Sequence, residues 1–204
     1  MYKIAVLVSG SGSDLQSIID AVESSYVNCS IKAVISDKPD VYALERAKSK
    51  GIETYVFDRK VYGKNISEEI LKVTEGKVDL IVLAGFLSIL SEKLIKIFSN
   101  KIINIHPSLI PSFCGNGMYG LKVHQAAIDY GVKFSGCTVH FVDEGTDTGA
   151  IILQQVVPVL ENDTAETLQK RVLEEEHKIL PKAVKLLAEG SVKIDGRKVY
   201  IGGV

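Results

Sequence analysis

The chain of 204 residues has no tryptophan, three cysteines and no excess of either charge. Cys29, Cys114 and Cys137 show no metal-ligand spacing and are odd in number, which favours free thiols in a reduced, cytoplasmic protein. Net charge is −1 and the Lys and Arg residues are scattered, which argues against a nucleic-acid surface. No apolar run reaches the roughly 18 residues of a membrane helix, and Ser9-Gly10-Ser11-Gly12 ends the first run too early for a signal peptide.

Apolar runs alternate with helical patterns along the chain, which at 46% hydrophobic and 24% charged residues has an ordinary globular composition. Strands are expected at 3–8, 31–35, 53–57, 78–83, 101–105, 136–142 and 151–157. Helices are expected at 14–22, 42–48, 67–75, 91–98, 122–129 and 164–189. Pro181 could break the last helix, and a hairpin turning at Asp195-Gly196 is expected at 192–201.

This alternation predicts an α/β fold with a doubly wound, mostly parallel sheet of about seven strands and helices on both faces, a Rossmann-like arrangement. The length and the lack of a low-complexity linker favour a single domain over 1–204. The Gly-rich loop 107–120 has no periodicity, and a long loop of this kind beside a candidate site is more often functional than not.

The segment Asn104-Ile105-His106-Pro107-Ser108-Leu109-Ile110-Pro111 follows an expected buried strand. Residues two apart on a strand point to the same face, so Asn104 and His106 leave the strand side by side at its carboxyl end, where open α/β sheets bind ligands. An amide can donate to a developing oxyanion and an imidazole can shuttle a proton, which suits carbonyl chemistry. The alternative is a loop-capping asparagine beside a hydrogen-bonded core histidine.

A second motif, Ser9-Gly10-Ser11-Gly12-Ser13-Asp14, joins the first expected strand to the first helix. Free N–H groups at a helix start can bind a phosphate. The motif is neither a Walker loop nor a full dinucleotide fingerprint, since Leu15 stands where the latter has glycine, so a mononucleotide-like or sugar-phosphate ligand fits best. The alternative is a plain turn capped by Ser13 or Asp14, and the charge of Asp14 disfavours a phosphate.

Asp147 lies in the turn after the strand that ends at Val142. It could reach a histidine on a neighbouring strand, although an Asx-turn is the more frequent role of such a residue. His140 is expected to be structural, and His124 and His177 to have surface or packing roles on helices.

Two charged segments complete the candidates. Residues 174–177 are expected to be mostly a solvated helix face, from which one carboxylate could hold a substrate amine. Arg59 and Lys60 follow the third strand and could contact an anion, although exposed basic residues are usually solvated.

Together these residues resemble those of the glycinamide ribonucleotide formyltransferases, folate-dependent enzymes of purine synthesis. The matching pieces span nearly the whole chain in the family's order: 9–16, 83–86, 103–111, 137–147 and 176–177. The Asn-x-His-Pro-Ser-Leu-x-Pro motif with a downstream Asp is specific to folate formyltransferases and their hydrolase relatives. The Ser-Gly-x-Gly-Ser loop narrows the resemblance to the glycinamide ribonucleotide branch.

The resemblance implies transfer of a formyl group from 10-formyltetrahydrofolate to the substrate amine, without a metal. It implies a phosphate-binding half, 1–100, and a catalytic and folate-binding half, 101–204, of one domain. The catalytic residues would be Asn104, His106 and Asp147. Substrate would be held by Gly12, Ser13 and Asp14 at the phosphate and by Glu176 at the amine. Folate would be bound by Arg59, Leu87, Ser88, Leu90, Val142, Asp143 and Glu144, partly through their backbones.

Three departures from the family pattern affect individual contacts. Asp14 stands where Asn is usual, Ser88 replaces a common Arg, and the loop 112–120 is longer than usual. The resemblance also implies small-molecule substrates, no nucleic-acid or membrane partner, and a monomer or weak homodimer.

Three rival functions remain at this stage. A formyltetrahydrofolate hydrolase normally carries an extra amino-terminal domain, whereas Lys3 begins the first expected strand here. A formyltransferase acting on initiator tRNA normally carries a carboxyl-terminal nucleic-acid domain. A non-catalytic phosphoribosyl-binding module would bind phosphate but no folate.

Overall fold

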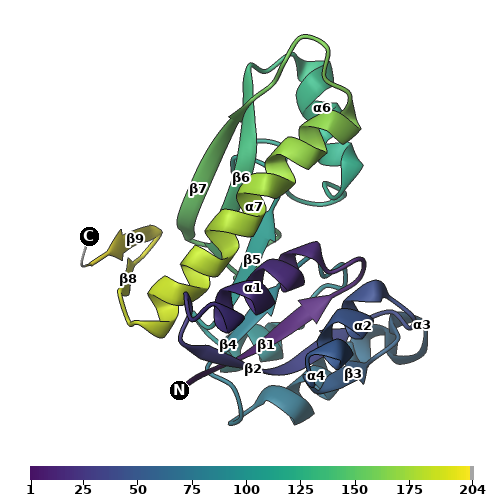
Figure 1. The fold of residues 1–204 in the computed structure, drawn as a ribbon, viewed down its shortest axis with the longest axis vertical. Helices are drawn as coiled ribbons and strands as arrows, with labels where there is room; N and C mark the ends of the chain where they lie inside the picture. The colour runs from purple at the N-terminus through teal and green to yellow at the C-terminus, as the bar shows by residue number, and fades with distance from the viewer. Residues whose placement is uncertain (203–204) are drawn as a thin grey trace. The chain divides into compact units, whose positions relative to one another are not determined.

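The computed structural model describes residues 1–202 and divides into two compact units, Met1–Asn104 and Ile105–Val204. A seven-stranded sheet has the order β3-β2-β1-β4-β5-β6-β7, and a separate sheet pairs β8 with β9 (Figure 1). The strands of the large sheet are Tyr2–Val8 (β1), Cys29–Ser36 (β2), Thr54–Val56 (β3), Leu80–Leu83 (β4), Ile102–His106 (β5), Phe134–Phe141 (β6) and Ile151–Pro158 (β7). The mostly parallel α/β sheet predicted from the sequence is confirmed.

The helices of the first unit follow the predicted pattern, with two short additions. They are α1 (Ser13–Glu23), α2 (Tyr42–Ser49), α3 (Arg59–Tyr62), α4 (Ile66–Thr74) and α5 (Glu92–Ile97), with a short 3-10 turn at Gly63–Asn65. Helix α3 and the 3-10 turn are the two elements that periodicity did not predict. Ser91 caps α5 as an N-cap, since its side chain accepts from the Leu94 N–H.

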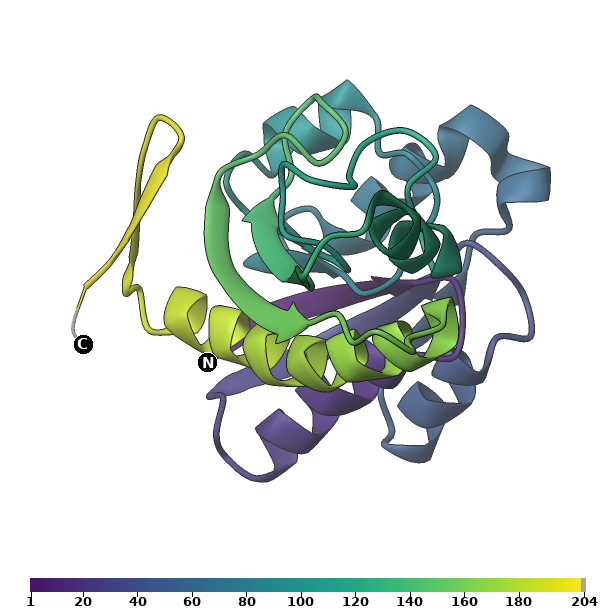
Figure 2. The same ribbon diagram turned by 90° about the horizontal axis from the view of Figure 1, so that it is seen from above.

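Strand order in the first unit reverses between β1 and β4. β1 pairs in parallel with both β2 and β4, and the chain moves outward through β2 and β3 before it returns to β4. Right-handed crossovers then place α1 and α2 on one face of these strands and α4 and α5 on the other. Figure 2 shows α1 and α2 together on one side of β1 and β2. Ligands of open α/β sheets bind at such a switch point, outside the carboxyl ends of the strands.

The second unit contains an antiparallel pair, β6 and β7, covered by a long helix. Helix α7 (Ala165–Ala188) packs against β6, β7 and α6 (Leu121–Tyr130). It runs through Pro181 without interruption, so the break considered from the sequence does not occur. The predicted hairpin is present as β8 (Val192–Asp195) and β9 (Lys198–Ile201), with Gly196 at φ +58° in its turn.

Candidate active site

The loop after β1 has the geometry of an anion site. Gly12 is the N-cap of α1 with φ +72° and ψ +33°, and its carbonyl accepts the first helical bond, from Gln16 N. The first N–H groups of a helix have no partner in the preceding turn and carry the positive end of the helix dipole. The amides at the start of α1 are therefore suited to a phosphate.

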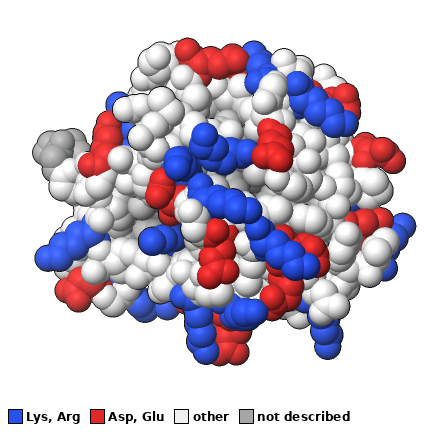
Figure 3. Space-filling view, turned by 90° about the horizontal axis from the view of Figure 1, so that it is seen from below, with Lys and Arg blue, Asp and Glu red and all other residues white. Residues whose placement is uncertain are grey.

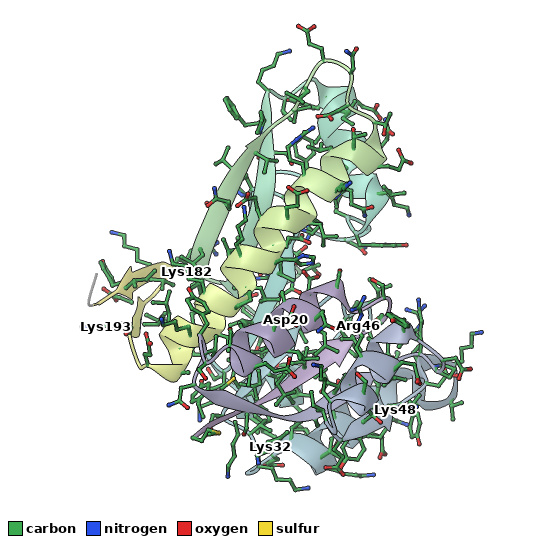
Figure 4. All side chains as sticks on the ribbon, viewed as in Figure 1. Asp20, Lys32, Arg46, Lys48, Lys182 and Lys193 are labelled. Carbon is green, nitrogen blue, oxygen red and sulfur yellow. The ribbon has the colours of Figure 1, made fainter. Side chains whose placement is uncertain are left out.

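Helix α2 packs directly against this loop. A Cβ added at Gly12 would lie 2.6 Å from Ala43 Cβ and 2.8 Å from Ala43 Cα, closer than atoms approach without a shift. Arg46, labelled in Figure 4, donates from Nε to Ser11 O at 3.0 Å and from a guanidinium nitrogen to Gln16 at 2.9 Å. Because glycine alone fits between α1 and α2, the loop conformation is fixed by packing as well as by φ.

Asp14, in the first turn of α1, is half-buried and its Oδ1 is buried. Burial raises the pKa of this carboxyl to about 6. A neutral carboxyl can donate a hydrogen bond, as an asparagine amide can, and below about pH 6 the negative charge of Asp14 is reduced.

The segment after β4, residues 84–90, contacts the loop that follows β1. The Leu87 N–H donates to Ser9 Oγ at 2.8 Å, which joins the carboxyl ends of β4 and β1 at the switch point. Leu90 is buried, whereas Leu87 is 43% exposed and Ile89 is 85% exposed. Exposed apolar side chains on a loop at a switch point offer a surface for a flat aromatic ligand.

Arg59 begins α3, next to Asp58, which caps that helix by accepting from Lys60 N. One of its guanidinium nitrogens lies 3.7 Å from Oδ2 of Asp37, and the Ser88 hydroxyl donates to the same oxygen at 2.6 Å. Sequence reasoning missed Asp37. Its position directly after β2, at the ligand-binding edge of a parallel sheet, was the available signal.

In the second unit, His106 ends β5 and is buried. Its Nδ1 lies 3.6 Å from Asp147 Oδ2, and its Nε2 lies 3.1 Å from the Phe113 carbonyl oxygen. Asn104 precedes it by two residues on the same strand, so both side chains belong to one face of β5. Both ring nitrogens of His106 thus face oxygen atoms, the Asp147 carboxylate at Nδ1 and the Phe113 carbonyl at Nε2.

Asp147 lies in the turn after β6, which brings it to His106; of the two roles considered from the sequence, this was the less frequent one. It has φ +58°, and its carboxylate accepts from Gly115 N at 2.9 Å. The carboxylate therefore reaches other segments, His106 and the loop 107–120, rather than closing an Asx-turn on its own backbone. Its placement allows it to orient an imidazole and to stabilise its charge.

Two further histidines lie near this pair. His140 Nε2 is 3.7 Å from Asp147 Oδ1, and its Nδ1 is 2.8 Å from the Phe141 carbonyl oxygen. Burial lowers the pKa of His140, and burial followed by the charge of His106 lowers the pKa of His124 to about 4. The expected structural role of His140 omitted its contact with Asp147, whereas His124 is buried in α6, which agrees with packing.

The remaining predicted residues of this unit differ in how far their side chains are exposed. Val142 is half-buried, whereas Asp143 and Glu144 are exposed; the Asp143 carboxylate accepts from Gly145 N and Thr148 Oγ1 and so shapes the turn. Glu176 is 7% exposed on α7, which sets it apart from the solvated face expected for 174–177. A buried carboxylate on this helix is better suited to a specific cation than an exposed one.

Over the described residues, no group of three His, Cys, Asp or Glu side chains could hold a metal ion. Within the same range, no helix is long and apolar enough to cross a membrane. Figure 3 shows basic and acidic side chains interspersed on the face that it presents.

The chain is similar in both sequence and structure to known proteins. The family model described as formyl transferase matches residues 2–184. The phosphoribosylglycinamide formyltransferase of Haemophilus influenzae is 42% identical over 206 residues, covering 100% of this chain and 95% of that protein. The crystal structure of glycinamide ribonucleotide transformylase 1 from Symbiobacterium toebii has a TM-score of 0.90 and 43% identity, covering 98% of this chain and 94% of that one.

Some relatives are much longer than this chain. The human trifunctional purine biosynthetic protein adenosine-3 is 43% identical over 195 residues, which cover 94% of this chain and 19% of that protein. The chain thus spans about a fifth of the length of the trifunctional relatives.

Proposed function

Because the chain belongs to the formyl transferase family, we propose that it transfers a formyl group from 10-formyltetrahydrofolate to the amine of glycinamide ribonucleotide in purine biosynthesis. The observation that carries this proposal is the placement of His106. It shares a strand face with Asn104, and its Nδ1 lies 3.6 Å from Asp147 Oδ2. The name of the Haemophilus relative supports the choice of acceptor.

The proposed reaction passes through a tetrahedral intermediate. The neutral amine attacks the formyl carbon, and the carbonyl oxygen becomes an oxyanion that accepts hydrogen bonds from Asn104 and His106. Collapse breaks the bond to N10 of the folate, and the proton lost by the amine reaches that nitrogen through water. Asp147 orients the imidazole and stabilises its charged form. The products are formylglycinamide ribonucleotide and tetrahydrofolate.

Binding is assigned to the remaining predicted residues. The phosphate meets the amides of Gly12, Ser13 and Asp14 at the start of α1, and Glu176 meets the substrate amine. The folate contacts are proposed at Arg59, Leu87, Ser88, Leu90, Val142, Asp143 and Glu144. No resident metal enters the proposed reaction.

The proposal also covers location and assembly. Cys29, Cys114 and Cys137 form no disulfide among the described residues, which supports a cytoplasmic location where thiols stay reduced. The enzyme is proposed to act on small molecules as a monomer or weak homodimer. The interspersed charges in Figure 3 support a surface without a nucleic-acid partner on that face.

The test is an assay of the purified chain with 10-formyltetrahydrofolate, with and without glycinamide ribonucleotide. We expect tetrahydrofolate to appear together with one equivalent of the formylated ribonucleotide, identified by mass, and only when the amine is present. Release of formate and tetrahydrofolate at the same rate without the amine would instead identify a hydrolase. Phosphate binding without folate binding would identify a non-catalytic module.

A further inference from the structure

Three segments of the first unit meet at one buried carboxylate that the proposed reaction does not use. Asp37 directly follows β2 and is 0% exposed. Ser88, from the segment after β4, donates to its Oδ2 at 2.6 Å, and the Arg59 guanidinium of α3 lies 3.7 Å from the same oxygen. The carboxylate therefore connects two residues that are proposed to bind folate.

The energetics of this carboxylate point to a role beyond packing. Burying a carboxylate costs several kcal/mol unless hydrogen bonds and an opposite charge offset it, and apolar residues of similar volume are often as stable. The bond from Ser88 is short and charge-assisted, which makes it stronger than a neutral one. The other oxygen, Oδ1, is buried and has no hydrogen-bond partner among the described residues. Burying this carboxylate costs free energy, and its hydrogen bonds offset only part of that cost. Its presence therefore calls for an explanation other than stability.

The position of the Asp37 carboxylate allows it to hold Ser88 and Arg59 in place. The backbone next to Ser88 is also fixed, since Leu87 N donates to Ser9 Oγ. Arg59 keeps donors for a ligand, because a guanidinium has five N–H groups and this side chain is 40% exposed. Ser88 is uncharged and bonded to Asp37, so the cation held beside this carboxylate comes from α3.

We infer that Asp37 is a positioning residue for the folate co-substrate: it fixes Ser88 and aims Arg59 at the carboxylates of the folate tail, and it touches no reacting atom. The inference rests on the proposed function. A guanidinium that is already oriented loses less side-chain freedom when the ligand binds, which improves affinity without altering the chemical step.

The test compares tetrahydrofolate with tetrahydropteroate, which lacks the glutamate tail, by isothermal titration calorimetry under anaerobic conditions. Asp37→Asn keeps an acceptor for Ser88 but removes the charge that faces Arg59. It should weaken tetrahydrofolate binding by about five- to tenfold, the range for one immobilised side chain, and weaken tetrahydropteroate binding less. Ser88→Ala should weaken both ligands to a similar degree. For Asp37→Asn, the kcat and the KM for glycinamide ribonucleotide should stay within about twofold of wild type, because Asp37 touches no reacting atom.

Asp79→Asn is the matched control, since that carboxylate accepts from Lys3 N at the opposite end of β1 and should leave both affinities unchanged. Wild-type affinity of Asp37→Asn for tetrahydrofolate, or a fall in kcat without a change in folate affinity, would overturn the inference. Should Asp37→Asn fail to fold, unchanged binding of both ligands by Ser88→Ala would overturn it equally. A folded wild-type chain that binds neither ligand would instead refute the proposed function, so the two failures are distinguishable.

Discussion

At the scale of single residues, Gly12 combines a left-handed backbone with the close approach of α2. Gly12→Ala strains the backbone by about 1–2 kcal/mol and drives its Cβ to 2.6 Å from Ala43 Cβ. Because the clash displaces the amides at the start of α1, the KM for glycinamide ribonucleotide should rise at least about tenfold, a loss of roughly 1.4 kcal/mol. Tetrahydrofolate affinity should stay near wild type in calorimetric titrations.

Gly76→Ala is the matched control for this prediction. Gly76 has φ +68°, and a Cβ there would meet open space, so its alanine variant carries the same backbone strain without the clash. It should lower the free energy of unfolding and leave the KM for the ribonucleotide unchanged. Equal loss of both ligands in Gly12→Ala would argue against a separate phosphate subsite.

Asp14 gives a pH dependence whose sign is fixed by burial. Its pKa is about 6 in the folded chain against 3.8 ordinarily. The carboxyl therefore favours folding below about pH 4, and that contribution is lost as the pH rises through about 6. The asparagine in Asp14→Asn does not ionise. The free energy of unfolding of this variant should therefore rise relative to wild type between about pH 4 and 6 and stay constant above that, where it exceeds the wild-type value by about 2–3 kcal/mol at pH 8. Urea unfolding at pH 4, 6 and 8 measures this, and a difference that does not vary with pH would contradict it.

The family resemblance named Asn104, His106 and Asp147 as catalytic, whereas residue types and positions alone left each of them a structural alternative. They did not point to Asp37, whose contacts with Ser88 and Arg59 join segments far apart in sequence. They also left His140 as a structural residue, since an apolar strand gives no sign that its ring faces Asp147. Long-range contacts of this kind depend on the fold and have no local pattern.

At the scale of elements, periodicity predicted the strands and long helices well, because each buries a regular apolar face. Helix α3 has four residues, too few for a helical pattern to repeat, and was missed. Pro181 removes one backbone donor from α7, but the helix continues because its apolar face packs on both sides of that residue, at Ile179, Leu180, Ala183 and Val184. Packing here outweighs a local helix-breaking signal.

The loop 107–120 divides into two parts with different expected behaviour. Residues 108–110 are held by Thr138, whose hydroxyl donates to Ser108 O and accepts from Ile110 N. Residues 113–115 instead contact the proposed catalytic pair, through Phe113 O at His106 and Gly115 N at Asp147. In the proposed reaction the formyl oxygen accepts a hydrogen bond from His106, so we expect substrate binding to rearrange this second part.

We predict that amide hydrogen exchange at 113–120 slows when both glycinamide ribonucleotide and a non-reacting folate are bound, because the rearranged loop closes over them. Exchange at 108–110 should not change, which makes that part an internal control. The measurement is exchange followed by mass spectrometry on the free chain and on the complex with both ligands. Equal protection at 113–120 in the two states would identify a static surface loop.

At the scale of the whole molecule, the fold brings together, within each unit, motifs that are far apart in the sequence. The switch point between β1 and β4 joins the glycine loop to the segment 84–90 through Ser9 and Leu87. In the second unit, the turn after β6 carries Asp147 to His106 at the end of β5. Sequence reasoning could name these segments because strand ends and turns are local features. The distances between them come only from the folded chain.

The central claim is that Asn104, His106 and Asp147 work as one unit in formyl transfer, and a double-mutant cycle on kcat tests it most directly. Asp147→Asn and His106→Asn should each lower kcat by about 10²–10³ with smaller changes in either KM, because the lost interaction matters most in the transition state. Asp129→Asn, an exposed carboxylate of α6 bonded to Gln125, serves as the control and should keep wild-type kcat. The account predicts that the double variant is little slower than the slower single variant. Fully additive losses, or a His106→Ala variant with near-normal kcat, would contradict it.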